Sequence, residues 1–582
     1  MQAEALDTID GGVGTYSVLL TRRLANGVPL SVDNTAQTSE QKLLPEARTH
    51  LQEAAASWLA PSTIINNPSM YLINTQAWMT QLRETDPQQE RITLGTVPNR
   101  EWQRLLPQFN EFYFMGLFAP SEASREHNIQ WAHEVRHMLP QDSGDIFIRS
   151  SPFAIPDYSP NPDIAENFDE IDAVVGFLHE HNKVAVVDAV LNHTARDHPW
   201  ATTRPDFYIQ GKTEQVNANP GAYFPVLAAD GERYFLAHGK DPNHPEWHDT
   251  LQLNWANPDL REEMKGVVRT LVQHFDGARA DVAMLLNSGT YTGTWGDHLT
   301  KTQKEYLQGN PVWPELVQTA QEEAAKLRKK FTFTAEAYWD KDILGTHFDR
   351  IYGSDYYKHL IRLASEKPGE SVEHLRWHLI HLMTARNSGR NYDDLVYTGN
   401  HDEEQPVVEF VDKERAMAAM VVTALIPNTT LLVNQGQEDG LTYKTSMKMS
   451  RFAEEQRDLQ MRAFHERLFL LKQTRLFQEG HGQVAHILED HSTQNDSIVA
   501  QQIEARESDE GKPAMGAIVC TNFTSAKARC RLPGIGQDVD VKVINMMTGE
   551  EVDNIDDQRD GGMFVELEPW KSQAIFYAPK AA

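Results

Sequence analysis

Four short apolar runs that end in acidic or polar residues constrain the fold of this 582-residue chain more than any other feature. They read VAVVDAVLNH (184–193), DGARAD (276–281), FTFTAE (331–336) and LVYTGNHD (395–402). A parallel strand buried on both faces is a continuous apolar run, and the residues that follow it lie at its carboxyl end. Four such strands predict a parallel sheet that gathers acidic side chains along one edge.

Helical patterns alternate with the strands. An apolar stripe at helical spacing precedes the run at 184, and a second follows Asn257-Pro258, an N-cap with proline at the first helical position. Eight strand candidates are found in total, at 69–79, 111–118, 184–190, 277–281, 331–336, 347–352, 395–398 and 429–433. Eight strands that mostly alternate with helices predict an α/β fold, a closed (β/α)8 TIM barrel rather than a doubly wound sheet.

The sequence pattern divides the chain into three regions. Residues 1–67 form an N-terminal extension that is rich in Ala, Thr and Gln, has a predicted helix near 45–59 and shows no recognisable chemistry. Residues 68–475 hold the barrel, with an insertion after the third strand at about 194–253 that is too long for a structureless loop. Residues 476–582 alternate short strands with turns, which predicts a C-terminal antiparallel β-sandwich domain.

Charge and composition exclude several classes of protein. The formal net charge of −29 argues against nucleic acid or an anionic membrane as a partner, because both reward basic patches. No window of about 18 apolar residues predicts a transmembrane helix. The first residues, MQAEALDTID, are acidic where a signal peptide is basic, so a cytoplasmic protein is predicted. Cys520 and Cys530 are interpreted as two buried thiols in preference to a disulfide.

Two of the strand-end acids have the chemistry for cleaving a glycosidic bond. Barrels of this kind keep their active sites at the carboxyl ends of the strands, where Asp281 and Glu336 follow successive strands. Such cleavage needs one carboxyl group as proton donor and another as nucleophile or base. Arg279 lies two residues before Asp281, on the same face of the strand, where it would keep Asp281 ionised. A single acid at the end of a strand can equally be a helix cap or a surface charge. Four such stretches in this order favour an active site instead.

These stretches resemble the sequence motifs of the α-amylase family, glycoside hydrolase family 13. The matching motifs are DAVLNH (188–193), GARADVA (277–283), the strand ending in Glu336 and GNHD (399–402), in the order of the family. Three further stretches also resemble the family, DTLQLN (249–254), SPFAIPDY (151–158) and NQGQE (434–438). The resemblance covers about residues 68–450, and DGARADVAML together with AEAYW resembles a bacterial branch of the family.

The resemblance implies catalytic roles for three acids. Asp281 would be the nucleophile and Glu336 the general acid/base. Asp402 would be the third carboxylate, which binds sugar hydroxyls and helps to distort the ring. Arg279 would orient the nucleophile and keep it ionised.

The resemblance also implies binding roles. His193 and His401 would hydrogen-bond the sugar, Asp188 would support them, and Phe153 stands where the family commonly has a stacking tyrosine. Asn192 occupies a position that often helps to bind calcium, but the insertion has no cluster of acids spaced for it, so neither a metal nor another cofactor is expected. Seven aromatic residues in or beside the strand-end loops are candidate sugar-stacking groups, about half of them expected to be loop packing: Trp200, Tyr223, Phe224, Trp247, Trp295, Tyr338 and Trp339.

The activity implied by the resemblance is that of a retaining α-glycosidase, which acts on α-glucosides or α-glucan oligosaccharides by double displacement. Met284 and Leu285 stand where many amylases carry a Lys-His pair. An apolar pair cannot hydrogen-bond a leaving-group sugar, so an α-glucan transglycosylase or phosphorylase is the alternative. A non-catalytic carbohydrate-binding relative is a more distant alternative, against which the complete set of acids argues. The sequence predicts no oligomeric state.

Overall fold

The computed structural model describes residues 54–85, 91–140, 143–385, 388–488, 496–505, 515–536, 538–552 and 562–580. Most of the N-terminal extension, including the greater part of the helix predicted at 45–59, lies outside the described residues. Residues 54–58 are helical. The first barrel strand begins at Ser69, directly after the predicted start of the barrel region.

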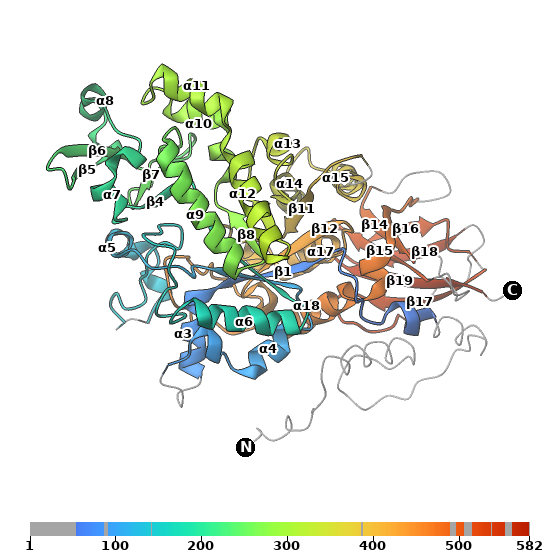
Figure 1. Ribbon diagram of the computed structural model, residues 1–582. Coiled ribbons are helices and arrows are strands. Elements are labelled where there is room, and N and C mark those ends of the chain that lie inside the picture. Colours follow the sequence, from blue (N-terminus) through green and yellow to red (C-terminus); the bar gives the residue numbers. More distant parts are fainter. Residues whose placement is uncertain are drawn as a thin grey trace.

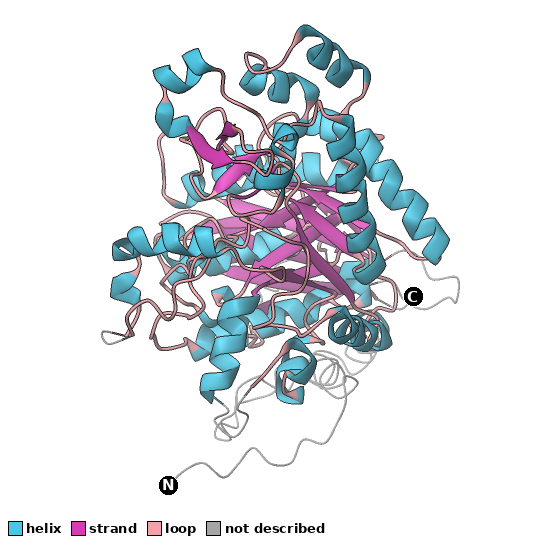
Figure 2. Ribbon diagram, turned by 60° about the vertical axis from the view of Figure 1, so that its left-hand side comes forward, coloured by secondary structure: helices cyan, strands magenta, loops and turns pink. Residues whose placement is uncertain are grey.

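Eight parallel strands close into a barrel, which helices surround (Figures 1 and 2). In chain order they are β1 (Ser69–Asn74), β2 (Glu111–Met115), β3 (Val184–Ala189), β8 (Gly277–Ala280), β9 (Thr332–Ala335), β10 (Arg350–Tyr352), β11 (Asp393–Tyr397) and β12 (Thr429–Asn434). Each strand pairs with the next one in this order, and β12 returns to pair with β1. The predicted (β/α)8 barrel is confirmed.

The helices begin and end where local hydrogen bonds dictate. The side chain of Asn257 caps α9 (Pro258–His274) as predicted, because its Oδ1 accepts from the N–H groups of Asp259 and Leu260. The strand predicted at 69–79 is wrong beyond Asn74. There the Asn74 Oδ1 accepts from the Ala77 N–H and starts α3 (Thr75–Thr85). Among the described residues, no helix combines the length and apolar character needed to cross a bilayer.

Five further helices cover the barrel. They are α6 (Phe168–Glu180), α12 (Val312–Leu327), α14 (Ser354–Ala364), α17 (Lys413–Ala424) and α18 (Leu459–Lys472). The helix α18 begins at residue 459, because the Asp458 carboxylate accepts from the N–H groups of Gln460 and Met461 and caps it there. The apolar stripes of these helices pack on the outward faces of the strands.

The insertion after β3 folds into a small subdomain above the carboxyl ends of the strands (Figure 1). Its first strand, β4 (His193–Ala195), pairs with its last, β7 (Thr250–Gln252), and a hairpin is formed by β5 (Tyr223–Leu227) and β6 (Arg233–Ala237). Two short helices, α7 (Trp200–Thr203) and α8 (Thr213–Ala218), complete it. The β4–β7 pair ties the subdomain to the strand end that carries His193.

The C-terminal region contains a five-stranded and a two-stranded antiparallel sheet, which confirms the predicted β domain. The larger sheet has the order β13 (His481–Val484), β14 (Ile498–Glu504), β15 (Gly516–Asn522), β19 (Ser572–Pro579) and β17 (Val539–Asn545). The smaller pairs β16 (Ala528–Leu532) with β18 (Met563–Leu567). The boundary predicted after residue 475 falls within α19 (Arg475–Glu479), just before β13.

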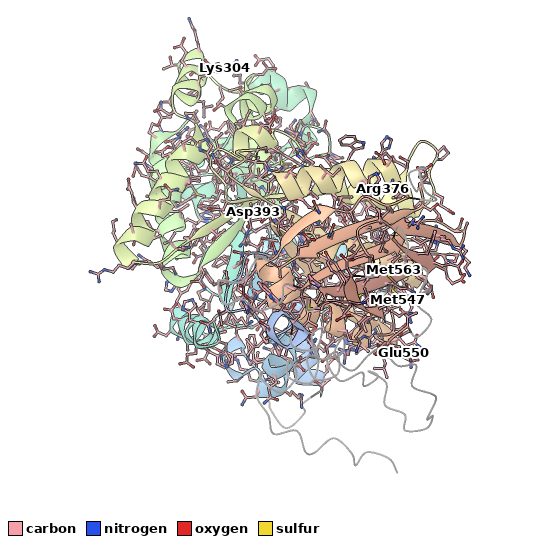
Figure 3. All side chains as sticks on the ribbon, turned by 90° about the vertical axis from the view of Figure 1, so that its right-hand side faces the viewer. Lys304, Arg376, Asp393, Met547, Glu550 and Met563 are labelled. Carbon is pink, nitrogen blue, oxygen red and sulfur yellow. The ribbon has the colours of Figure 1, made fainter. Side chains whose placement is uncertain are left out.

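Alternating residues of the larger sheet belong to two different cores. Val519 packs with the barrel, whereas its neighbour Cys520 packs with the smaller sheet, next to Cys530. Both cysteines are buried and unbonded, as predicted. Figure 3 shows α15 (Val372–Thr384), with Arg376 labelled, lying along this sheet, and the Arg376 Nη2 donates to the Ile498 carbonyl at 2.6 Å. The barrel and the sheet therefore share one continuous core.

A buried ion pair spans the amino end of the barrel. Glu111 begins β2, and Arg350 begins β10 on the opposite side of the eight-strand ring. The two Nη atoms of Arg350 donate to the two carboxylate oxygens of Glu111 at 2.5 and 2.6 Å. Such a bidentate pair fixes the strands at this end, so that the carboxyl ends are free to carry polar groups.

Candidate active site

The four motifs converge at the carboxyl end of the barrel. Asp281 follows β8 directly, Glu336 follows β9 directly, and Asp402 lies five residues after β11. Asp281 and Glu336 are buried, at 6% and 3% exposure, whereas Asp402 is half-buried. The ends of β8, β9 and β11 therefore place these three acids at the same rim of the barrel.

One guanidinium joins the two buried carboxylates. The Arg279 Nη1 donates to the Asp281 Oδ1 at 2.5 Å, and its Nη2 lies 2.8 Å from the Glu336 Oε2. Arg279 is 1% exposed and is enclosed by the rings of Phe153 and Tyr352, whose centroids lie 4.9 and 5.8 Å from its Cζ. These contacts fix the plane of the guanidinium, so it holds both carboxylates at once.

The backbone after Asp281 also contributes to the site. Val282 adopts a left-handed conformation with φ +41°, which is strained for a β-branched residue by about 1–3 kcal/mol. In this conformation its N–H donates to the Glu336 Oε2 at 2.7 Å. The other oxygen of Glu336, Oε1, accepts from the Tyr338 hydroxyl at 3.2 Å. The strained turn thus aims a donor at Glu336 immediately after the strand that supplies Asp281.

Burial controls the protonation of the acids. Burial raises the pKa values of Asp281 and Glu336, the Arg279 guanidinium opposes this rise, and the negative charge of Asp281 raises the pKa of Glu336 further. The pKa of Asp188 is raised to about 6 by burial, again against the attraction of Arg279. Glu336 therefore ionises less readily than Asp281. A pair made of a proton donor and a nucleophile needs such a difference.

The two predicted histidines face the same space. Burial lowers the pKa values of His193 and His401 to about 4, so both imidazoles are neutral near pH 7. The His193 Nε2 lies 3.9 Å from the Asp281 Oδ2, and the His401 ring centroid lies 5.2 Å from that of half-buried Phe153. The His401 Nε2 lies 3.2 Å from the Asp402 Oδ2, whereas its Nδ1 is buried without a hydrogen-bond partner among the described residues. The Nδ1 is available to a hydroxyl-bearing ligand.

Asp188 and Asn192 lie beneath this space and have structural contacts. The Asp188 carboxylate accepts from the Tyr113 hydroxyl and from the Gly116 N–H, which ties β3 to the end of β2. The Asn192 Nδ2 lies 3.3 Å from the Gln252 Oε1. Nowhere in the described ranges are three His, Cys, Asp or Glu side chains placed to hold a metal ion, so no metal ligands are assigned.

Sequence reasoning missed two tyrosines that complete the site. Tyr113 and Tyr352 are fully buried on barrel strands, where their hydroxyls bond Asp188 and Arg279. A tyrosine buried in a barrel strand needs a partner for its hydroxyl, and this was the available signal. Met284 and Leu285 are buried at 0% and 4% exposure in the short helix Ala283–Leu286.

The candidate aromatic residues divide into two groups. Tyr338 bonds Glu336, and the ring of Trp247 lies 5.1 Å from that of His193, so both reach the site. Trp200 packs against Phe207, and the Tyr223 hydroxyl bonds His298 in the insertion subdomain. Two of these four aromatic residues therefore lie at the site, and the other two pack within the insertion subdomain.

Comparisons with known proteins identify relatives of this arrangement. A family model described as the alpha amylase catalytic domain matches residues 155–528. The chain is 24% identical over 292 residues to the oligo-1,6-glucosidase of Parageobacillus thermoglucosidasius, covering 46% of this chain and 51% of that protein. It is 21% identical over 349 residues to the probable oligo-1,6-glucosidase 2 of Bacillus subtilis, covering 52% and 57%. The chain thus spans about half the length of the curated relatives it matches.

Solved structures share the fold at lower identity. An alpha-amylase from Lactobacillus plantarum superposes with a TM-score of 0.57 at 16% identity, over 88% of this chain and 99% of that one. The maltogenic alpha-amylase AmyB from Thermotoga neapolitana does so with a TM-score of 0.59 at 16% identity, over the same shares. At this identity the likeness concerns the fold alone.

Proposed function

Because this chain belongs to the α-amylase family, glycoside hydrolase family 13, we propose that it is a retaining α-glycosidase acting on α-glucosides or α-glucan oligosaccharides. The observation that carries this proposal is the bridge from Arg279 to both Asp281 and Glu336. Retaining enzymes hold their two carboxyl groups about 5 Å apart, without room for a water molecule between them and the sugar. Two carboxylates that share one guanidinium suit that spacing.

The proposed reaction has two displacement steps. Glu336 gives its proton to the leaving oxygen while Asp281 attacks the anomeric carbon and forms a covalent glycosyl intermediate. Glu336, now ionised, removes a proton from water, which attacks the same carbon and releases Asp281. Asp402 and the neutral imidazoles of His193 and His401 would bind sugar hydroxyls, and the half-buried ring of Phe153 would stack on the sugar.

Substitution of the nucleophile tests the proposal. The variant D281N should lose all measurable turnover of 4-nitrophenyl α-glucoside, maltose and isomaltose, the last included because two relatives are named oligo-1,6-glucosidases. The matched control is D276N, at the other end of the same strand, where an amide oxygen can still accept from the Ala185 N–H. NMR of the first product should show the α-anomer. A β-anomer, or normal activity of D281N, contradicts the proposal.

Transfer to an acceptor other than water is the second candidate. It is favoured by the burial of Met284 and Leu285, which leaves no Lys-His pair to bind a leaving-group sugar. Maltotriose incubated with and without phosphate separates the outcomes, because longer oligosaccharides indicate disproportionation and glucose 1-phosphate indicates phosphorolysis.

We propose that no metal is required, so EDTA should leave turnover unchanged. Binding of the glucan with no turnover would indicate a non-catalytic relative.

A further inference from the structure

Tyr338 contacts the oxygen of Glu336 that Arg279 and Val282 leave free. The Tyr338 residue lies two positions after Glu336, and its hydroxyl donates to the Glu336 Oε1 at 3.2 Å. Its ring is partly buried against the core, and the Lys358 Nζ on α14 lies 5.5 Å from the ring centroid. Packing and this cation therefore hold the hydroxyl beside Glu336.

The contacts of Glu336 determine which of its oxygens carries a proton. Oε2 accepts from the Val282 N–H at 2.7 Å and lies 2.8 Å from the Arg279 Nη2. Neither of these groups can accept a hydrogen bond, so a proton on Oε2 would face two donors. The protonated form of Glu336 consequently carries its proton on Oε1, the oxygen that Tyr338 contacts.

The direction of the Tyr338 hydrogen bond then determines where that proton points. A protonated carboxyl oxygen keeps one acceptor position. When the Tyr338 hydroxyl occupies that position, the acidic O–H of Glu336 must point elsewhere, into the site. After the proton has left, Tyr338 donates to a carboxylate, and such a charge-assisted hydrogen bond is about twice as strong as a neutral one. Tyr338 thus stabilises ionised Glu336 more than protonated Glu336.

Building on the proposed function, we propose that Tyr338 is a positioning residue that directs the acidic proton of Glu336 toward the leaving-group oxygen and stabilises the carboxylate formed by its transfer. In that step the proton moves from the Glu336 Oε1 to the glycosidic oxygen. The bond from the anomeric carbon to that oxygen breaks with its electron pair on oxygen, and a bond from the Asp281 carboxylate to the carbon forms. In the second step Glu336 recovers a proton from water.

Burial and the neighbouring Glu336 carboxylate raise the pKa of the Tyr338 hydroxyl, so it stays a neutral donor through the whole cycle. A hydroxyl that lost its own proton near neutral pH would be negatively charged and would destabilise ionised Glu336 instead of stabilising it. A phenylalanine at this position keeps the ring and its contact with Lys358 and removes only the hydroxyl. Y338F therefore isolates the hydrogen bond.

Leaving-group dependence distinguishes this role from a structural one. An alcohol such as the sugar released from maltose or isomaltose needs a proton as it leaves, whereas 4-nitrophenolate hardly does. Y338F should lower kcat/KM about tenfold or more for the better of the two disaccharides, and less than about threefold for 4-nitrophenyl α-glucoside. The basic limb of the disaccharide pH profile should move to higher pH, because Glu336 releases its proton less readily.

The matched control is Y356F. Tyr356 on α14 is also buried, and its hydroxyl shares a hydrogen bond with the Thr423 hydroxyl, away from the site. Y356F should leave both the substrate ratio and the pH profile unchanged. If Y338F lowers kcat/KM equally for both substrates and the basic limb of the disaccharide pH profile stays in place, the inference is wrong while the proposed function stands. A wild-type protein that cleaves none of these substrates would overturn the proposed function and the inference with it.

Discussion

Replacing Arg279 with glutamine should move the whole pH profile of the enzyme to alkaline values. In the wild-type protein burial raises the pKa of Asp281 to about 6 and that of Glu336 to about 7, in both cases against the attraction of Arg279. Activity requires Asp281 ionised and Glu336 protonated, so the two limbs of the wild-type bell report the titration of this pair. Without the guanidinium both carboxyl groups hold their protons more tightly, and both limbs shift upward.

The size of the shift follows from the contacts. Breaking a buried ion pair costs about 3–5 kcal/mol, and each pKa unit corresponds to about 1.4 kcal/mol. An attraction of about 3 kcal/mol lost from Asp281 raises its pKa by about 2, to about 8. At pH 7 the ionised fraction of Asp281 then falls from about nine tenths to about one tenth, while the protonated fraction of Glu336 rises from about one half toward one. The value of kcat/KM therefore drops about fivefold from ionisation alone.

The assay is kcat/KM for 4-nitrophenyl α-glucoside from about pH 5 to about pH 10. The control is R261Q, which removes a guanidinium that is equally buried but pairs with Glu315 outside the site. R261Q should lower thermal stability and leave the limbs in place. An acidic limb of R279Q that stays at its wild-type position, or moves lower, would refute the electrostatic role of Arg279. A loss of equal size at every pH would refute it too.

Two further predictions concern the scaffold. E111A leaves Arg350 buried without its partner and should destabilise the protein by about 3–5 kcal/mol, seen as a lower melting temperature, whereas the double variant E111L/R350M should lose much less. Equal losses in both variants would contradict the pairing argument. Cys520 and Cys530 should react with a thiol reagent only after unfolding, since both are buried; two thiols that titrate in the native protein would show that the smaller sheet opens.

The barrel could be predicted because its strands are buried on both faces. The strand Val184–Ala189 is an apolar run that ends in polar residues, and β1 and β12 likewise carry apolar runs that end in asparagine. The carboxyl ends of parallel strands meet at one rim, so the positions of Asp281, Glu336 and Asp402 followed from the strands alone. Local pattern and topology agree here, and that agreement makes the prediction reliable.

The remaining parts of the site depend on tertiary contacts that leave no local pattern. The reach of Arg279 to Glu336 crosses from β8 to β9, and the left-handed Val282 contradicts the usual preference of a β-branched residue. The predicted strand extends five residues past the true end of β1 at Asn74. The reason is that the apolar residues Trp78 and Met79 continue the pattern into α3. The hydrogen bond from the Ala77 N–H to the Asn74 Oδ1 marks the boundary between the strand and the helix. The apolar pattern of the sequence does not reveal this bond.

Closure of the barrel joins parts of the chain that are made at very different times. The Asn74 N–H at the end of β1 donates to the Gln435 side chain just after β12, 361 residues later. A ribosome adds about 5–20 residues per second, so β1 waits roughly 20–70 s for the strand that closes the ring. During that interval one edge of β1 has no neighbour and can pair with another chain. The last contact of the barrel thus sets the period in which the nascent protein most needs protection from aggregation.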